Sequence, residues 1–247
     1  MSLGVHPEAV DSSALGWLSD GHDVLPANLG YFLDRSWRMH PAVCAPVSEL
    51  SYEGALHSKL PETTNRSLEG VAPGLSVHPV VHHGDSTSSA AEAETVVEIV
   101  RSVLGRRWRD GDAQTRGDGD GARPLGVDDV IVVAPYNAQV ETVRAALAAA
   151  GLDGVPVGTV DKFQGREAVV AIVSLAASSA AEVPRGMEFL LMKNRLNVAI
   201  SRAMWAAHLV FSPALADHLP YDARELATLS AFLRLSRAAP SDPSPSA

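Results

Sequence analysis

The sequence predicts an α/β fold in which a mostly parallel β-sheet is covered by helices on both faces. Short runs that are apolar at every position are typical of strands buried on both sides of a sheet. These runs alternate with segments of helical periodicity, which favours parallel strands joined by helical crossovers. With 247 residues, of which 46% are hydrophobic, the chain is long enough to bury the core of such a domain.

The first strand and helix are predicted between residues 75 and 104. Leu75–Val81 has alternating and β-branched character, which indicates a strand. Glu92–Leu104 then places apolar side chains on one helical stripe, formed by Val96, Ile99, Val100, Val103 and Leu104.

The second strand and helix follow at once. Asp129–Ala134 is a short apolar run that Pro135 ends, as expected of a buried strand. Gly151 is a suitable C-cap for the next helix. The apolar positions of that helix are Val140, Val143 and Leu147.

Three further buried strands and one helix complete the predicted sheet. The strands are expected at Val155–Val160, Val169–Leu175 and Ala206–Phe211, and the helix at Asn194–Arg202. Functional side chains of parallel sheets gather at the carboxyl ends of the strands. We therefore expect the functional residues just after the apolar runs.

Charge and composition narrow the class of protein. A formal net charge of -9 argues against binding nucleic acid by bulk electrostatics. The segment Thr159–Trp205 differs, because it holds six basic and four acidic residues. The single cysteine, Cys44, excludes an internal disulfide and suits a buried position in a protein of the reducing cytoplasm. No apolar run reaches the ~18 residues of a membrane span, so no membrane partner is expected.

Two segments are predicted to be unstructured, because they contain too few apolar residues to fold. They are Arg109–Arg123 and the tail of residues 238–247. The GDGDG run within the first segment superficially resembles a phosphate or calcium loop. It lacks the flanking strand and helix, so we interpret it as a flexible insert.

The first cluster of candidate functional residues lies in Ser36–Pro41. A guanidinium beside an aromatic ring and before a proline is rigidly presented. Trp37 suits stacking on a purine, and Arg38 suits a phosphate. The alternative is a core tryptophan beside a surface arginine.

The second cluster, Ala134–Gln139, follows a buried strand at the start of a helix. Its polar and aromatic side chains suit a nucleic-acid strand, which needs a stacking surface and donors to its backbone. The alternative is a helix cap with a packed Tyr136.

The third cluster, Thr159–Glu167, lies between two strands. Gly165 allows close approach of a backbone N–H to a phosphate, and Glu167 suits a ribose hydroxyl or a metal-bound water. The alternative is an ordinary polar connection.

The fourth cluster is Asn194–Ala203. The helical spacing predicts that Arg195 and Arg202 project from one face, where two arginines suit a polyphosphate. A solvated helix face is the alternative.

Other chemistries find little support in the sequence. The motifs G-x-x-x-x-G-K-[ST], H-E-x-x-H and G-x-S-x-G are absent from it. The pair His82–His83 has no third ligand at a recognisable spacing, so no metal site is expected. A Rossmann-like enzyme is disfavoured because no glycine-rich turn follows the first strand.

The four clusters, read in order as WRMHP, APYNAQ, TVDKFQGRE and NRLNVAISRA, resemble the motifs of the second motor domain of superfamily 1 helicases. The likeness is greatest to the branch of the nonsense-mediated-decay helicase. PRGMEFLL at Pro184–Leu191 is similar to bacterial proteins that join a RecB-like nuclease to this core. The four motifs span Trp37 to Ala203.

The resemblance implies a RecA-like, P-loop-type three-layer sandwich that shares ATP and Mg²⁺ with a first motor domain. It implies that Arg38 and Arg202 are arginine fingers, that Trp37 packs on adenine, and that Gly165 and Glu167 line the nucleotide. The residues matched to the binding edge for single-stranded DNA or RNA are Pro135, Tyr136, Asn137 and Thr159. Trp37 departs from the family, which usually has tyrosine there.

The resemblance also implies a domain organisation. Residues 1–31 match a connector from the first domain, residues 32–237 the second domain, and residues 238–247 a tail. The phosphate-binding loop belongs to the first domain, so we expect no ATP hydrolysis by this chain alone. The alternative function is a non-catalytic module that binds single-stranded nucleic acid.

Overall fold

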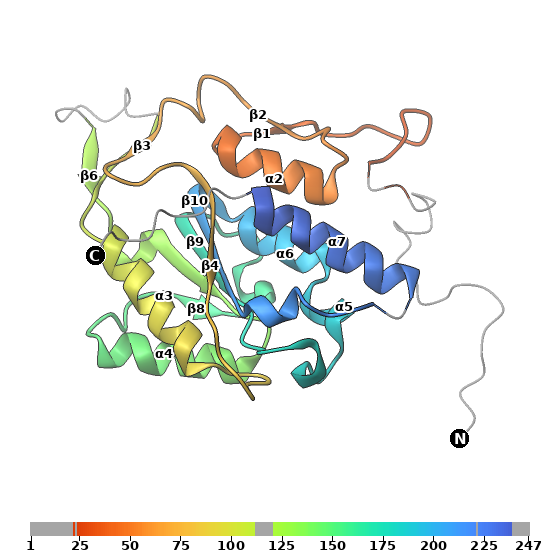
Figure 1. Ribbon diagram of the computed structural model, residues 1–247. Helices are drawn as coiled ribbons and strands as arrows, with labels where there is room; N and C mark the ends of the chain where they lie inside the picture. Colours follow the sequence, from red (N-terminus) through yellow and green to blue (C-terminus); the bar gives the residue numbers. More distant parts are fainter. Residues whose placement is uncertain (1–21, 23, 112–120, 221, 239–247) are drawn as a thin grey trace.

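The computed structural model describes residues 22, 24–111, 121–220 and 222–238, and its centre is a parallel β-sheet (Figure 1). The sheet has five strands in the order β4-β10-β9-β7-β8. The strands are β4 (Gly74–Pro79), β7 (Val130–Val133), β8 (Val157–Gly158), β9 (Ala168–Ser174) and β10 (Ala203–Phe211). Every residue of β7, β9 and β10 is buried, as expected of strands covered on both faces.

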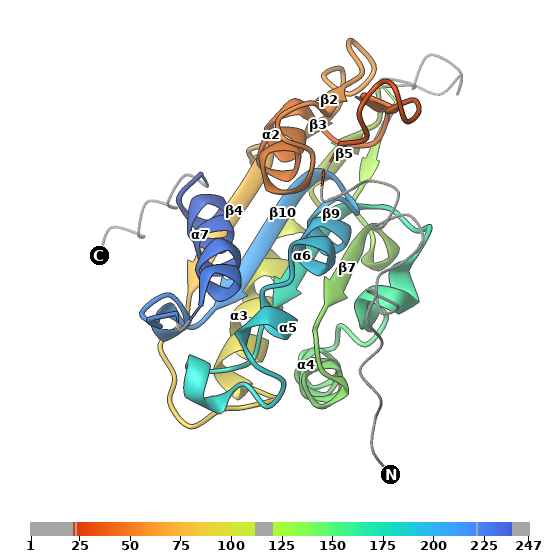
Figure 2. The same cartoon turned by 90° about the vertical axis from the view of Figure 1, so that its right-hand side faces the viewer.

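Helices cover both faces of this sheet (Figures 1 and 2). One face carries α2 (Pro41–Ser51), α5 (Met187–Leu190), α6 (Lys193–Ile200) and α7 (Ala223–Ala238), and the other carries α3 (Ala90–Val103) and α4 (Asn137–Ala149). Strand side chains alternate between the two cores. Ile131 and Val133 pack on the α2 side, whereas Val130 and Val132 pack on the α3 side. The predicted three-layer fold is confirmed.

Short elements surround the central layers. A parallel pair is formed by β1 (Arg35–Ser36) and β2 (His57–Ser58). An antiparallel sheet is formed by β3 (Ser67–Leu68), β5 (Arg107–Arg109) and β6 (Ala122–Pro124). Single 3₁₀ turns are η2 (Val127–Asp129), η3 (Val160–Phe163), η4 (Ala180–Glu182) and η5 (Pro213–Leu215). None of the helices in the described part of the chain has both the length and the apolar composition to cross a membrane.

The structure corrects the predicted flexible insert. Arg109 belongs to β5, and Ala122 and Arg123 belong to β6, so both ends of the segment Arg109–Arg123 are ordered in the small sheet. Backbone hydrogen bonds between β5 and β6 order these residues, and such bonds form without apolar side chains. Residues 112–120, together with residues 1–21, 23 and 239–247 of the predicted connector and tail, lie outside the described residues.

The apolar periodicity of the sequence does not predict helix α2. The helix starts well, because Pro41 stands at N1 and the Nδ1 atom of His40 accepts from the backbone N–H of Ala42. Pro46 stands inside the helix, where it removes one hydrogen bond and hides the helical pattern. Cys44 is buried in this helix, and burial raises the pKa of its thiol.

A buried polar network joins α3 to the ends of β4 and β9. Glu92 is fully buried, and its Oε2 atom accepts from Ser174 Oγ at 2.6 Å and from Ala176 N at 2.9 Å. Its Oε1 atom lies 3.2 Å from His82 Nε2, and this hydrogen bond raises the pKa of His82. A buried carboxylate needs such partners, because an unpaired charge is costly to bury. Among the described residues, no three His, Cys, Asp or Glu side chains are placed to hold a metal ion.

Candidate functional site

The structure divides the predicted functional residues into two groups at opposite ends of the parallel sheet. Pro135 and Thr159 follow β7 and β8, at the carboxyl ends of the strands. Glu167 and Arg202 directly precede β9 and β10, at the amino ends. The expectation that all functional residues follow the apolar runs is therefore wrong for the second pair. We call the two groups the carboxyl-end pocket and the amino-end site.

The amino-end site brings Arg38 and Arg202 together. Arg38 Nε donates to Glu167 Oε2 at 2.9 Å, and Arg38 Nη1 donates to the carbonyl oxygen of Ser201 at 3.2 Å. Arg202 Nε donates to the carbonyl oxygen of Val198 at 2.9 Å. Burial and then the positive charge of Arg38 lower the pKa of Arg202. Arg38 and Arg202 therefore lie close enough for the positive charge of Arg38 to act on the guanidinium of Arg202.

Trp37 presents its ring at the same site. The residue is 61% exposed, and Lys59 Nζ lies 5.3 Å from the ring centroid. This exposure excludes the core tryptophan that the sequence left as an alternative. A cavity of about 300 Å³ lies beside the ring and is lined by Ser36, Trp37, Arg38, Arg66 and Glu167.

Arg66 is a residue of this site that sequence reasoning missed. Its guanidinium donates to the carbonyl oxygens of Arg38 and Trp37, and its Nε atom pairs with Asp110 Oδ1 at 3.0 Å. The side chain of Arg66 is only 8% exposed, so these contacts fix the backbone of the exposed Trp37 and the partly exposed Arg38. No motif marks Arg66, because its role depends on a contact across 28 residues of chain.

Gly165 lies in the turn before Arg166 and Glu167 and has a φ angle of +79°. An added Cβ atom would meet nothing within 4 Å, so a substitution is resisted by the backbone conformation and not by a clash. We expect Gly165→Ala to lower the free energy of unfolding by about 1 kcal/mol in urea denaturation. Gly126→Ala is the matched control, because Gly126 has a φ of −96° and room for a Cβ atom. Equal stability of the two variants would contradict the assigned strain.

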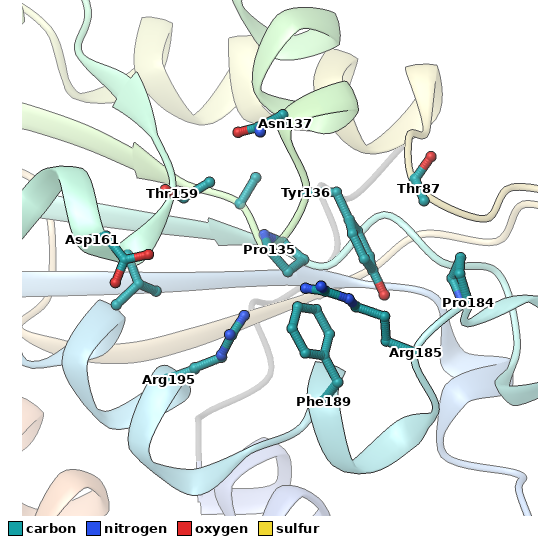
Figure 3. A pocket seen from close by; sticks show the side chains of 12 residues that line it. Thr87, Pro135, Tyr136, Asn137, Thr159, Asp161, Pro184, Arg185, Phe189 and Arg195 are labelled. Atoms are coloured by element: carbon teal, nitrogen blue, oxygen red, sulfur yellow. The ribbon is translucent and has the colours of Figure 1, made fainter. Parts of the chain in front are cut away.

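The carboxyl-end pocket collects all four residues predicted to bind a nucleic-acid strand (Figure 3). It has a volume of about 500 Å³ and is lined by Thr87, Ala134, Pro135, Tyr136, Asn137, Thr159, Val160, Asp161, Pro184, Arg185, Phe189 and Arg195. Tyr136 is the N-cap residue of α4, and its ring packs 5.7 Å from that of Phe189. Burial raises the pKa of the Tyr136 hydroxyl. Tyr136 therefore both lines the pocket and is the packed N-cap residue that the sequence offered as the alternative.

Arg195 and Arg202 do not share a helix face. Helix α6 ends at Ile200, so Arg202 lies in the turn beyond it, while Arg195 lines the carboxyl-end pocket. The expectation of a paired face is wrong because α6 is shorter than the sequence pattern suggests. Instead, the helix runs from one site to the other, a span of about 12 Å for its eight residues.

The model of a protein family described as AAA domain matches residues 17–212 of this chain. The chain is 27% identical over 207 residues to the putative helicase mov-10-B.1 of Danio rerio, covering 73% of this chain and 19% of that protein. It is 30% identical over 176 residues to the DNA polymerase alpha-associated DNA helicase A of Schizosaccharomyces pombe, covering 69% and 26%. It is 36% identical over 184 residues to the RNA helicase Mov10l1 of Homo sapiens, covering 69% and 14%. The chain thus spans about a quarter or less of the length of these relatives.

Proposed function

Because the chain belongs to the AAA domain family and is a helicase-like domain, we propose that it is the second motor domain of an ATP-dependent nucleic-acid helicase. In this proposal it supplies arginine fingers and part of a single-strand track, and a first domain supplies the phosphate-binding loop. The observation that carries the proposal is the convergence of Arg38 and Arg202 beside Glu167 at the amino ends of β9 and β10.

The amino-end site has the chemistry that ATP requires from this side. Two guanidinium groups stabilise the charge that develops on the transferred phosphoryl group. The pair between Arg38 and Glu167 is partly exposed, at 30% and 53% of the two side chains, so exchanging it for a phosphate costs little. The exposed ring of Trp37 offers a surface for adenine. Mg²⁺ would be held by carboxylates of the first domain.

The carboxyl-end pocket has the chemistry that a single strand of DNA or RNA requires. Its wall combines aromatic rings with hydroxyl, amide and guanidinium donors, which suit contacts to the backbone of a strand. The surrounding segment is locally basic although the whole chain is acidic. Binding at this pocket therefore needs no basic surface elsewhere.

Helix α6 provides the mechanical link between the two sites. Arg195 at its beginning lines the pocket, and Arg202 just beyond its end reaches the amino-end site. Closure of a first domain onto the triphosphate would draw Arg202 toward it, and a rigid helix would transmit that displacement to the strand. Hydrolysis would then release both.

Hydrolysis measurements with and without a partner domain test this function. We expect no ATP turnover by the chain alone, and turnover that single strands stimulate once a domain with a phosphate-binding loop is added or fused. Release of phosphate is the readout. Turnover by the isolated chain, or none by the combined domains, would reject the proposal.

A non-catalytic module for single-stranded nucleic acid is the second candidate. The observation in its favour is that Pro135, Tyr136, Asn137 and Thr159 meet in one pocket of about 500 Å³, at the end of the sheet away from Arg38 and Arg202. This module would bind labelled single strands in a salt-dependent manner, and ATP would not alter that affinity even in the presence of the partner domain. A change of strand affinity with nucleotide in the combined domains favours the motor.

A further inference from the structure

The guanidinium groups of two arginines in the carboxyl-end pocket, Arg185 and Arg195, pack against one aromatic ring, that of Phe189. The guanidinium carbon of Arg195 lies 4.0 Å from the centroid of the Phe189 ring, and that of Arg185 lies 4.7 Å from it. Figure 3 shows both side chains reaching into the pocket beside this ring. The negative face of an aromatic ring attracts such cations, so the contacts fix where the two charges lie.

Both guanidinium groups keep their charge available. Within the described part of the chain, no carboxylate lies within ion-pair distance of Arg185 or Arg195. This differs from Arg38 and Arg66, which pair with Glu167 and Asp110. Asp161 also lines the pocket (Figure 3), but beyond ion-pair distance of either arginine, so two cations face one carboxylate there, which suits an anion that presents more than one oxygen.

The aromatic rings of the pocket are already engaged with each other and with the cations. Phe189 contacts both guanidinium groups, and Tyr136 packs against Phe189 with an interplanar angle of 32°. The Tyr136 hydroxyl is buried and has no hydrogen-bond partner among the described residues. Phe189 is thus already in contact with two guanidinium groups and one ring, whereas a phosphate would approach the guanidinium groups from the pocket.

We propose that Arg185 and Arg195 bind phosphodiester groups of the strand, and that Phe189 is the positioning residue that holds them in place. This inference rests on the proposed function, because it names the part of the strand that the carboxyl-end pocket recognises. The pocket therefore binds the sugar–phosphate backbone of the strand and makes no base-specific contacts. Binding at this point is independent of sequence.

Salt dependence of strand binding measures the two contacts directly. The full chain would be titrated with a labelled single-stranded oligothymidylate and with an abasic strand of the same length, followed by fluorescence anisotropy. We expect Arg185→Ala and Arg195→Ala each to weaken binding of both strands about tenfold. Each variant should also reduce the slope of log affinity against log salt by about 0.7.

Arg101→Ala is the matched control, because Arg101 is an exposed arginine in the last turn of α3. It should keep the wild-type affinity and slope. Unchanged salt slopes in Arg185→Ala and Arg195→Ala, with tight binding retained, would overturn the inference while leaving the motor proposal intact. A loss confined to the base-bearing strand would also overturn it. Failure of the wild-type chain to bind either strand, with or without the partner domain, would instead remove the strand track itself.

Variants of Phe189 test the positioning role. Phe189→Tyr keeps an aromatic ring for the two cations, and Phe189→Leu keeps apolar volume without one. We expect the tyrosine variant to bind like wild type and the leucine variant to lose about tenfold in affinity while its net charge is unchanged. Thermal unfolding would identify a variant with a damaged fold. Wild-type affinity in a folded Phe189→Leu variant would show that the ring does not position the arginines.

Discussion

Replacing Arg202 by alanine is expected to lower ATP turnover about a thousandfold when this domain works together with a domain that carries a phosphate-binding loop. Arg202 stands directly before β10, and its guanidinium donates to the carbonyl oxygens of Val198 and Arg166. Burial lowers the pKa of Arg202, which lies close enough to Arg38 that the positive charge of Arg38 lowers it further. A charge fixed in this way stabilises the transition state without reorganising during the reaction.

The measurement is steady-state hydrolysis of ATP by the combined domains at saturating single strand. A finger that acts on the transition state lowers kcat and leaves the affinity for ATP nearly unchanged. Arg195→Ala serves as the comparison, because that residue lies at the other end of α6 and should chiefly raise the strand concentration needed for stimulation. Undiminished kcat in Arg202→Ala would remove Arg202 from the catalytic machinery.

The second large effect concerns the dependence of stability on pH. His208 in β10 is 9% exposed, and burial together with the neighbouring His78 lowers its pKa to about 3. Its Nδ1 atom lies 3.0 Å from His78 Nε2, and its buried Nε2 atom has no hydrogen-bond partner among the described residues. A proton on this imidazole would therefore be a charge without compensation inside the sheet.

The sign of the effect follows from which state binds the proton. Above pH 6.5 His208 is neutral in both the folded and the unfolded chain and adds no pH dependence. As the pH falls below 6.5, the unfolded chain takes up a proton that the folded chain refuses until about pH 3. We expect this residue alone to lower the free energy of unfolding by roughly 5 kcal/mol between pH 6.5 and pH 3.

Urea denaturation across this pH range, with wild type and His208→Gln compared, measures the contribution. Glutamine keeps a polar group beside His78 and does not titrate, so the variant should lose less stability as the pH falls. His57→Gln is the control, because His57 is exposed in β2 and its replacement should leave the wild-type profile unchanged. Parallel profiles for wild type and His208→Gln would contradict the assignment.

The central layers of the fold could be predicted from the sequence because their signals are local. The strands β7, β9 and β10 are recognisable from short apolar runs, β4 from alternating and β-branched residues, and α3 and α4 from a single apolar stripe. Such patterns follow from burial on one or both faces, which each segment encodes by itself. Weaker local signals explain the failures, since Pro46 obscures the helical pattern of α2 and strands of two or three residues leave almost no pattern.

The chain by itself determined which residue types carry the chemistry, since the four motifs and their order can be read without coordinates. Only the tertiary structure decided how those residues are distributed over the two ends of the sheet. It put Arg195 at one end of α6 and Arg202 just beyond the other end, added Arg66, which no motif marks, and packed Phe189 of the PRGMEFLL segment against two arginines. The reason is physical: a motif records neighbours along the chain, whereas a site is built from contacts between strands and loops whose closeness depends on how the whole sheet is wound.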